Sequence, residues 1–402
     1  MKKKAVTMWT AFSVGLAASC SYAFDNGLVG RIGRGMNIGN ALEAPSEGAW
    51  GVVIQEEYFT TIADAGFNSV RIPIAWHYHA STSEPYSIDE TFFSRIDWVI
   101  EKALANHLAI VIDMHHYEEL NQTPTAQKPR FFSMWRQIAE RYTAISDSLI
   151  FELINEPNTN LGADTLNRYQ AELVPMIREI SPSRPLILTT TGYSDLYNLD
   201  DVRLPADTFN IAVAVHYYTP FEFTHQGASW IRGSRQWLGT QWNGTTEEKE
   251  RIAGDLDSAA AWSSAHGIPI YVSEFGAITR ADAASRERWI AFVVQSCEER
   301  GFCWAYWDFC TNFGVYNRTT SAWNTALLAA LTPATTGASF VHLPASTPIH
   351  RQAKGWYTPL TVVDMAGRKL SVHYYLNGGK TASGIYVTPP LPGRHMLPMS
   401  VR

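Results

Sequence analysis

Residues 149–157 read LIFELINEP, an apolar run that passes into Asn155 and Glu156 and then into proline. The run Leu149–Leu153 is typical of a strand buried on both faces of a parallel sheet. Pro157 favours the start of a helix, because proline is preferred in the first helical turn. We therefore expect Asn155 and Glu156 to lie at the carboxyl end of a buried parallel strand, the edge at which functional side chains of α/β proteins gather.

Short β-branched runs alternate with longer segments of helical periodicity from about residue 31 to residue 332. This alternation predicts parallel strands joined by helices. The predicted strands are Gly33–Ile38, Ser69–Ile72, Leu108–Asp113, Leu149–Leu153, Leu186–Thr190, Ile211–Val215, Ile270–Ser273 and Cys303–Tyr306. The predicted helices include Glu56–Ala65, Phe92–Asn106, Phe131–Tyr142, Leu166–Ile180, Glu247–His266 and Ser285–Arg300. Eight such strands favour a (β/α)8 TIM barrel over an open sheet, which needs a glycine-rich phosphate turn that this chain lacks.

Polar residues stand at or just after the ends of seven of these eight strands. In a TIM barrel the carboxyl ends of the strands form one face, and that face holds the active site. The pattern therefore predicts a site built from Asn37, Asn40, Arg71, His115, His116, Asn155, Glu156, His216, Tyr218, Glu274 and Trp307.

Glu156 and Glu274 end the predicted fourth and seventh strands, which face each other across a barrel mouth. Cleavage of a glycosidic bond uses two carboxyl groups, one as acid and the other as nucleophile or base. A lone glutamate is more often a surface or helix-capping residue, but Glu156 stands between Asn155 and a helix-starting proline. We therefore predict a retaining pair about 5–5.5 Å apart.

The neighbouring residues have roles under this hypothesis. Asn155 would bind the sugar 2-hydroxyl, and Arg71 and Tyr218 would keep Glu274 ionised. Glu156 would keep its proton, which requires a raised pKa. Trp307 would stack on the sugar at the cleavage point, although a buried core position also suits a tryptophan.

The pair His115-His116 raises the alternative of a metal-dependent hydrolase. Adjacent residues of a strand point to opposite sides, so both rings are not expected to bind one ion. We therefore predict no metal and no cofactor, and we assign both histidines to sugar hydroxyls or to the orientation of Glu156.

The motifs RGMNIGNALE from Arg34, VRIP from Val70, His115-His116, Asn155-Glu156-Pro157, HYY from His216 and EFG from Glu274 resemble glycoside hydrolase family 5. The similarity runs from about residue 28 to residue 332, and two segments, from Asn40 and from Tyr218, are most similar to subfamily 25. The resemblance implies a (β/α)8 barrel with Glu156 as acid/base and Glu274 as nucleophile. It also implies substrate contacts from Asn40, Glu43, His115, His116, Asn155, His216, Tyr218, His225, Trp230 and Trp307, the first two on the non-reducing side.

The N-terminus resembles a signal peptide at residues 1–23, with Lys2–Lys4, the apolar run Ala5–Ala18 and a small residue at the predicted cleavage site. A lipoprotein box ending at Cys20 is the alternative, but its leucine stands one place too far away. We expect a bacterial extracellular or cell-surface protein. No later segment is long and apolar enough to span a membrane.

The composition shifts near residue 333. Seven Lys or Arg and one acid, Asp364, follow in 334–402, whereas the whole chain has a net charge of −6, which argues against a nucleic-acid partner. We predict a catalytic domain at 24–333, a linker at 334–348 and a small β-rich module at 349–402, with strands Leu360–Val363, Leu370–Leu376 and Gly384–Val387. The module resembles bacterial C-terminal sorting modules.

The leading hypothesis is a monomeric retaining endo-β-1,4-glucanase whose partner is a β-1,4-linked polysaccharide. A β-mannanase or a dual glucanase and mannanase of the same fold is the alternative, and a non-catalytic sugar-binding barrel is a third. Three cysteines remain after residue 23, Cys297, Cys303 and Cys310, which we expect to be buried thiols, although one disulfide among them is the alternative.

Overall fold

The computed structural model describes residues 27–333, 355–363, 369–376 and 385–388. The chain divides into two compact units, residues 1–347 and residues 348–402. The predicted signal peptide, Cys20 and the whole predicted linker lie outside the described residues.

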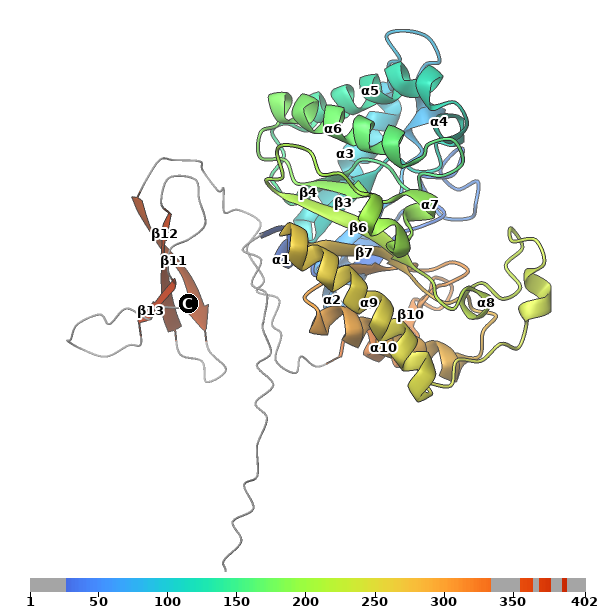
Figure 1. The fold of residues 1–402 in the computed structure, drawn as a ribbon. Coiled ribbons are helices and arrows are strands. Elements are labelled where there is room, and N and C mark those ends of the chain that lie inside the picture. Colours follow the sequence, from blue (N-terminus) through green and yellow to red (C-terminus); the bar gives the residue numbers. More distant parts are fainter. Residues whose placement is uncertain (1–26, 334–354, 364–368, 377–384, 389–402) are drawn as a thin grey trace, which may run out of the picture. The chain divides into compact units, whose positions relative to one another are not determined.

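The first unit is a closed barrel of eight parallel strands in the order of the sequence (Figure 1). The strands are β1 Arg34–Asn37, β2 Ser69–Ile72, β3 Ala109–Asp113, β4 Leu149–Glu152, β5 Leu186–Thr189, β6 Ile211–Tyr217, β7 Ile270–Phe275 and β8 Cys303–Tyr306. Every residue of these strands is buried, as expected for a parallel sheet covered on both faces. The predicted barrel and its eight strands are confirmed, and only the strand ends differ.

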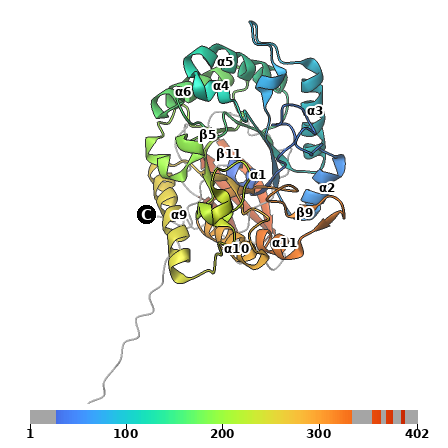
Figure 2. The same cartoon turned by 90° about the vertical axis from the view of Figure 1, so that its right-hand side faces the viewer.

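Helices surround the strands as a ring (Figure 2). The long helices are α2 Glu56–Asp64, α3 Glu90–Ala105, α5 Pro124–Arg141, α6 Ala163–Ile180, α9 Thr246–His266 and α10 Ala283–Glu299. The shorter ones are α1 Gly27–Ile32, α4 Glu118–Gln122, α7 Thr191–Ser194, α8 Phe221–Thr224 and α11 Thr325–Leu331, with 3-10 turns η1 Trp76–His79, η2 Leu196–Asp201 and η3 Ser234–Trp237. Local signals set the ends of these helices. Thr245 and Glu248 form a capping box before α9, and Gly267 ends that helix with a φ of 67°.

The inside of the barrel changes from apolar to polar along the strands. Leu28 and Ile32 of α1 pack with inward residues of the strands, such as Val111 and Ile150. Two residues further along the same strands stand Asp113 and Glu152, also buried. Because alternate residues of a strand face the same side, these carboxylates lie directly above the apolar layer. The barrel thus places charged groups on an apolar floor.

A β-bulge changes the direction of the side chains at the end of β7. Val215 pairs with Val272, but the next residue, His216, pairs with Glu274, so Ser273 is an extra residue in β7. The pairing with β8 shifts at the same place. Such a bulge turns the following side chain towards the other face. Glu274 consequently faces the barrel mouth, although strict alternation from Tyr271 would turn it outwards.

A two-stranded hairpin, β9 Tyr316–Asn317 and β10 Ala322–Trp323, follows β8. The second unit contains a three-stranded antiparallel sheet of β11 Gly355–Val363, β12 Lys369–Leu376 and β13 Ile385–Thr388. The predicted β-rich character of the tail is therefore confirmed, whereas its predicted boundaries stay predictions.

Candidate active site

The two predicted carboxylates meet at the barrel mouth. Ligand atoms of Glu156, His216 and Glu274 all lie within 4.8 Å of one another. The Nδ1 atom of His216 lies 3.0 Å from Oε1 of Glu156 and 3.6 Å from Oε2 of Glu274. Two glutamates that are distant in the sequence therefore flank one small space. Two carboxylates and a histidine at these distances also have the donor atoms of a cation site.

Arg71 is the centre of the polar layer and is fully buried. Its Nε and NH2 atoms donate to both oxygens of Glu152 at 2.7 and 2.9 Å, a bidentate pair. NH1 donates to Oε1 of Glu274 at 2.8 Å, and NH2 donates to Oδ1 of Asn155 at 2.8 Å. NH2 also lies 2.8 Å from Oδ2 of Asp113. One cation thus faces three carboxylates, which fixes its position closely.

Glu274 receives hydrogen bonds on both oxygens. The phenol of Tyr218 donates to Oε2 at 2.9 Å, opposite the contact with Arg71 on Oε1. Both predicted contacts are present. Burial nevertheless raises the pKa of Glu274 above its ordinary value, while His216, Arg71 and the Tyr218 hydroxyl act in the opposite direction. The carboxylate is therefore held in one orientation and is a stronger base than a free glutamate.

Glu156 stands just beyond β4 with a φ of 48°, and its side chain is 31% exposed. Burial of the carboxyl group raises its pKa to about 7, although His116 and Arg71 oppose the shift. A carboxyl group with this pKa still carries a proton near neutral pH. The raised pKa that the sequence hypothesis requires is therefore present.

His216 contacts both carboxylates. Its ring is neutral, because burial lowers its pKa. Its Nε2 atom has no hydrogen-bond partner among the described residues, whereas Nδ1 faces Glu156. The proton is assigned to Nδ1 on this ground, so the ring donates to Oε1 of Glu156.

An aromatic wall lies beside the pair. The ring of Trp307 lies parallel to His115, with 6.1 Å between ring centroids. A side chain on Gly39 would place its Cβ 2.8 Å from Cη2 of Trp307, and one on Gly276 would lie 2.0 Å from its carbonyl oxygen. Glycine at position 39 therefore leaves room for the indole of Trp307, and glycine at position 276 leaves room for its backbone.

The predicted contacts on the non-reducing side lie in the turn after β1. Asn40 has a φ of 62°, and the carboxylate of Glu43 accepts from the backbone N–H groups of Asn40 and Ala41. Glu43 is only 1% exposed, and burial raises its pKa to about 8. Glu43 thus shapes this turn, and its predicted contact with sugar stays a prediction.

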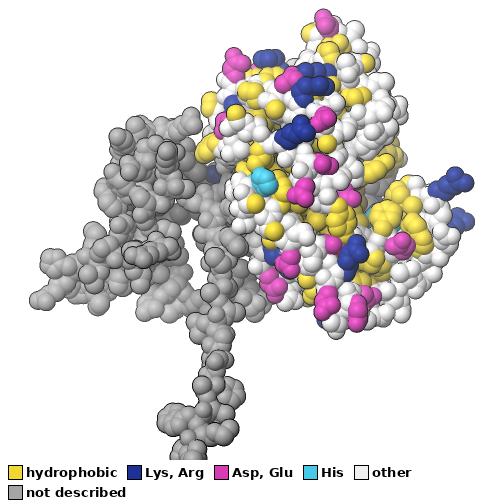
Figure 3. All heavy atoms as spheres, viewed as in Figure 1, with side chains coloured by type: hydrophobic (Ala, Val, Ile, Leu, Met, Phe, Trp, Pro, Cys, Tyr) yellow, Lys and Arg dark blue, Asp and Glu magenta, His cyan; other side chains and the backbone are white. Residues whose placement is uncertain are grey.

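His225 and Trp230 belong to the long segment after β6. The His225 ring stacks on Phe221 at 4.1 Å and lies 4.9 Å from Tyr218, while Trp230 is 52% exposed. Hydrophobic side chains gather at the surface over this α8 segment (Figure 3), where Leu238 is also exposed. His225 therefore contacts the site residue Tyr218, whereas Trp230 lies exposed at the edge of the site.

Sequence reasoning missed four residues of the site. Glu152 is a charge inside an otherwise apolar strand, which was the available signal. Asp113 lies beneath His115 and was not given a role. Trp50 is 45% exposed with its ring 5.8 Å from His116. Tyr193 is 59% exposed in α7, and no sequence pattern marks it.

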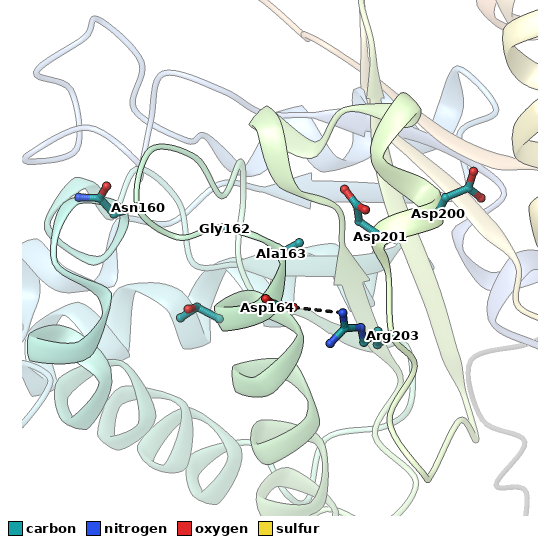
Figure 4. Close-up of a pocket in the computed structure, with 8 residues that line it drawn as sticks. Asn160, Gly162, Ala163, Asp164, Asp200, Asp201 and Arg203 are labelled. Atoms are coloured by element: carbon teal, nitrogen blue, oxygen red, sulfur yellow. Dashed lines mark ion pairs between the residues drawn. The ribbon is translucent and has the colours of Figure 1, made fainter.

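A second depression lies beside the start of α6, outside the site (Figure 4). Its one ion pair joins Arg203 to Asp164 at 3.1 Å, and both side chains are largely exposed, so it contributes little. None of the predicted site residues lines this depression.

The three predicted thiols are free cysteines, Cys297 and Cys303 buried and Cys310 half-buried. Burial raises the pKa of each, so none is a reactive thiolate.

The sequence family model for cellulases, glycosyl hydrolase family 5, matches residues 33–313, which is most of the barrel unit. The chain belongs to glycosyl hydrolase family 5. This family 5 chain is 34% identical over 311 residues to Endoglucanase H of Acetivibrio thermocellus. The match covers 76% of this chain and 33% of that protein, so the chain spans about a third of that relative's length.

Solved structures also resemble the barrel. Cel5A of Thermotoga maritima in complex with cellobiose has 45% sequence identity and a TM-score of 0.75, covering 77% of this chain and 99% of that one. The same protein in complex with mannotriose has 44% identity, a TM-score of 0.75 and the same coverage. No helix among the described residues is long and apolar enough to cross a membrane.

Proposed function

We propose that this family 5 protein is a secreted retaining endo-β-1,4-glucanase, with Glu156 as acid/base and Glu274 as nucleophile. The observation that carries the proposal is that one carboxylate oxygen of Glu156 and one of Glu274 lie within 4.8 Å of each other. Retaining glycosidases have carboxyl groups about 5–5.5 Å apart, whereas inverting enzymes leave about 6.5–9.5 Å for a water molecule.

In the first step, Glu274 attacks the anomeric carbon while Glu156 protonates the leaving oxygen. The Nδ1–H group of His216 donates a hydrogen bond to Oε1 of Glu156, so the carboxyl proton of Glu156 resides on Oε2. That oxygen is then free to protonate the leaving group. Arg71 and Tyr218 hold both oxygens of Glu274, which aims the carboxylate and limits its freedom before attack.

In the second step, water replaces the leaving sugar and Glu156 acts as base. The charge of Glu156 is one of the causes that raise the pKa of Glu274, so the two carboxylates oppose each other's ionisation. Covalent bonding removes the negative charge of Glu274. Ionisation of Glu156 is therefore easier in the intermediate. The same residue consequently serves as acid first and as base second.

The aromatic side chains at the barrel mouth and the relatives support the proposed substrate class. Aromatic rings of Trp307, Trp50 and Trp230 stand at the barrel mouth, where they suit the apolar faces of pyranose rings. Endoglucanase H and the cellobiose complex of Cel5A support a β-glucan. The mannotriose complex of Cel5A favours the second candidate, a mannanase or dual activity.

We propose residues 1–23 as an export signal, a monomeric enzyme, and a basic β-rich module at 349–402 that directs the exported protein. The catalytic proposal is tested by assaying residues 24–402 for reducing-end release. The substrates are carboxymethylcellulose, mixed-linkage β-glucan, xyloglucan, glucomannan, galactomannan and xylan. Faster release from glucans supports the glucanase, and faster release from galactomannan supports the mannanase. A folded protein that releases sugar from none of them contradicts both.

The pH dependence of kcat/KM should be bell-shaped. Activity requires ionised Glu274 and protonated Glu156, and the pair titrates as a coupled system. Because the pKa of Glu156 is about 7, kcat/KM should fall as pH rises through about 7. The acidic limb should lie above the pKa of a free glutamate, because the pKa of Glu274 is raised. Initial rates on an aryl β-cellobioside from pH 3 to 10 measure both limbs.

Tyr193 should bind the sugar on the leaving side. Its backbone N–H donates to the carbonyl of Pro157, next to the acid/base, and Ser194 Oγ accepts from the N–H of Glu156 at 3.2 Å. Gly192, Tyr193 and Ser194 all have positive φ, so the turn holds the exposed ring beside Glu156.

Tyr193→Ala should therefore lower kcat/KM on cellopentaose about fivefold, the loss of roughly 1 kcal/mol of stacking. Hydrolysis of a dinitrophenyl cellobioside, which lacks a leaving sugar, should change little. Phe209→Ala is the matched control, because Phe209 is 44% exposed just before β6, at the opposite end of the barrel. Equal losses in the two variants would contradict the assignment.

A further inference from the structure

Asp113 lies at the end of β3, fully buried beneath the site. Its Oδ1 atom accepts from the backbone N–H of Ile74 at 2.9 Å. Its Oδ2 atom lies 2.7 Å from Nδ1 of His115 and 2.8 Å from NH2 of Arg71. Both oxygens therefore have protein partners, and the side chain is fully buried, so substrate does not contact it.

His115 takes its tautomer from this carboxylate. Burial and the Arg71 charge hold the pKa of His115 well below its usual range, so the ring carries one proton. An ionised Asp113 can only accept, which places that proton on Nδ1. Nε2 is then an acceptor, and it lies 3.3 Å from Nδ2 of Asn155.

Hydrogen bonds fix both the oxygen and the nitrogen of the Asn155 amide. Oδ1 accepts from NH2 of Arg71 at 2.8 Å, and one Nδ2 proton points to His115. A flipped amide would set Nδ2 against the guanidinium and Oδ1 against the lone pair of His115 Nε2. The unflipped amide keeps one N–H group free for the cleft.

We infer that Asp113 is a positioning residue that fixes the tautomer of His115 and thereby aims the free N–H of Asn155 at the 2-hydroxyl of the cleaved sugar. The inference rests on the proposed function, in which Asn155 binds that hydroxyl. Asp113 acts on the transition state through two intermediate side chains and touches no reacting atom.

The substitution Asp113→Asn would reverse the direction of the hydrogen bonds from position 113 to His115 and Asn155. An Asp113→Asn side chain keeps the bond from Ile74 through its oxygen and turns an NH₂ group towards His115. His115 would then accept at Nδ1 and carry its proton on Nε2, where it opposes the Asn155 amide. The variant also loses the ion pair between Asp113 and Arg71, so a control must remove a charge from Arg71 without touching His115. Beyond that shared loss, Asp113→Asn loses the orientation of one amide, as happens when the aspartate of a catalytic triad becomes asparagine.

The experiment combines two readouts on the wild type and Asp113→Asn. Nitrogen-15 NMR of the histidines reports the tautomer of His115, assigned with a His115→Gln variant. Kinetics compare dinitrophenyl β-cellobioside with its analogue lacking the 2-hydroxyl on the cleaved sugar. We expect an Nδ1–H tautomer in the wild type and an Nε2–H tautomer in the variant. We expect kcat/KM to fall roughly 10- to 100-fold for the hydroxylated substrate and less than about threefold for the analogue.

Glu152→Gln is the matched control, because Glu152 contacts Arg71 but not His115. It should leave the tautomer unchanged and affect both substrates equally. Equal losses on both substrates in Asp113→Asn, or a wild-type His115 with its proton on Nε2, would overturn the inference. The wild-type tautomer decides the matter even where the variant does not fold. Failure of the proposed function is seen separately, as an absence of hydrolysis by the wild type.

Discussion

Glu274→Ala should lower kcat/KM on glucan by about 10⁴-fold or more, because the covalent route loses its nucleophile. Folding should survive the change. Arg71 keeps its bidentate pair with Glu152 and its contact with Asp113. Removing one of three carboxylates that crowd a single cation also relieves repulsion among like charges. The melting temperature is therefore expected to stay the same or to rise.

The stereochemistry of rescue tests the role of Glu274 directly. The alanine variant leaves a space into which azide fits, so azide should attack a dinitrophenyl β-cellobioside and release the α-glycosyl azide. Initial rates with and without azide, and NMR of the product, measure both. Glu222→Ala, which removes an exposed carboxylate in α8, is the control and should keep wild-type activity. A Glu274→Ala variant with more than a tenth of wild-type activity would contradict the assignment.

Glu156→Gln should show a loss that depends on the leaving group. General acid catalysis contributes about 10²- to 10⁴-fold, so hydrolysis of polysaccharide should fall by that range. Formation of the intermediate from dinitrophenyl cellobioside should fall far less, because that leaving group needs no proton. The alkaline limb near pH 7 should also disappear from this first step, since it reports the ionisation of Glu156.

Azide separates the two carboxylates. In Glu156→Gln the intermediate on Glu274 forms and then waits for water without a base. Azide should accelerate its breakdown and release the β-glycosyl azide, the opposite configuration from that of Glu274→Ala. Burst kinetics and product NMR provide the measurement. The same azide configuration from both variants would show that the two roles are not divided as proposed.

Most of the barrel and both catalytic candidates could be predicted from the sequence. Buried parallel strands are largely apolar, and β8 was predicted with the bounds that the structure shows. The bounds of β2 were also predicted correctly, although Ser69 and Arg71 interrupt its apolar pattern. Polar residues at strand ends were also visible as interruptions of those runs. The role of Glu152 was not visible, because its partner Arg71 is 81 residues away. Tyr193 depends on a left-handed turn that no local pattern of Tyr and Ser predicts.

The sequence by itself determined which residues form strands. A strand buried on both faces needs apolar side chains on both, so it is visible as a short apolar run. The sequence also determined that Glu156 follows one of those strands and that Glu274 lies near the carboxyl end of another. Only the tertiary structure decided that Glu274 faces inwards, since the extra residue Ser273 is defined by pairing with β6. Only the tertiary structure decided the raised pKa of Glu156, because desolvation and the fields of distant charges arise when the barrel closes.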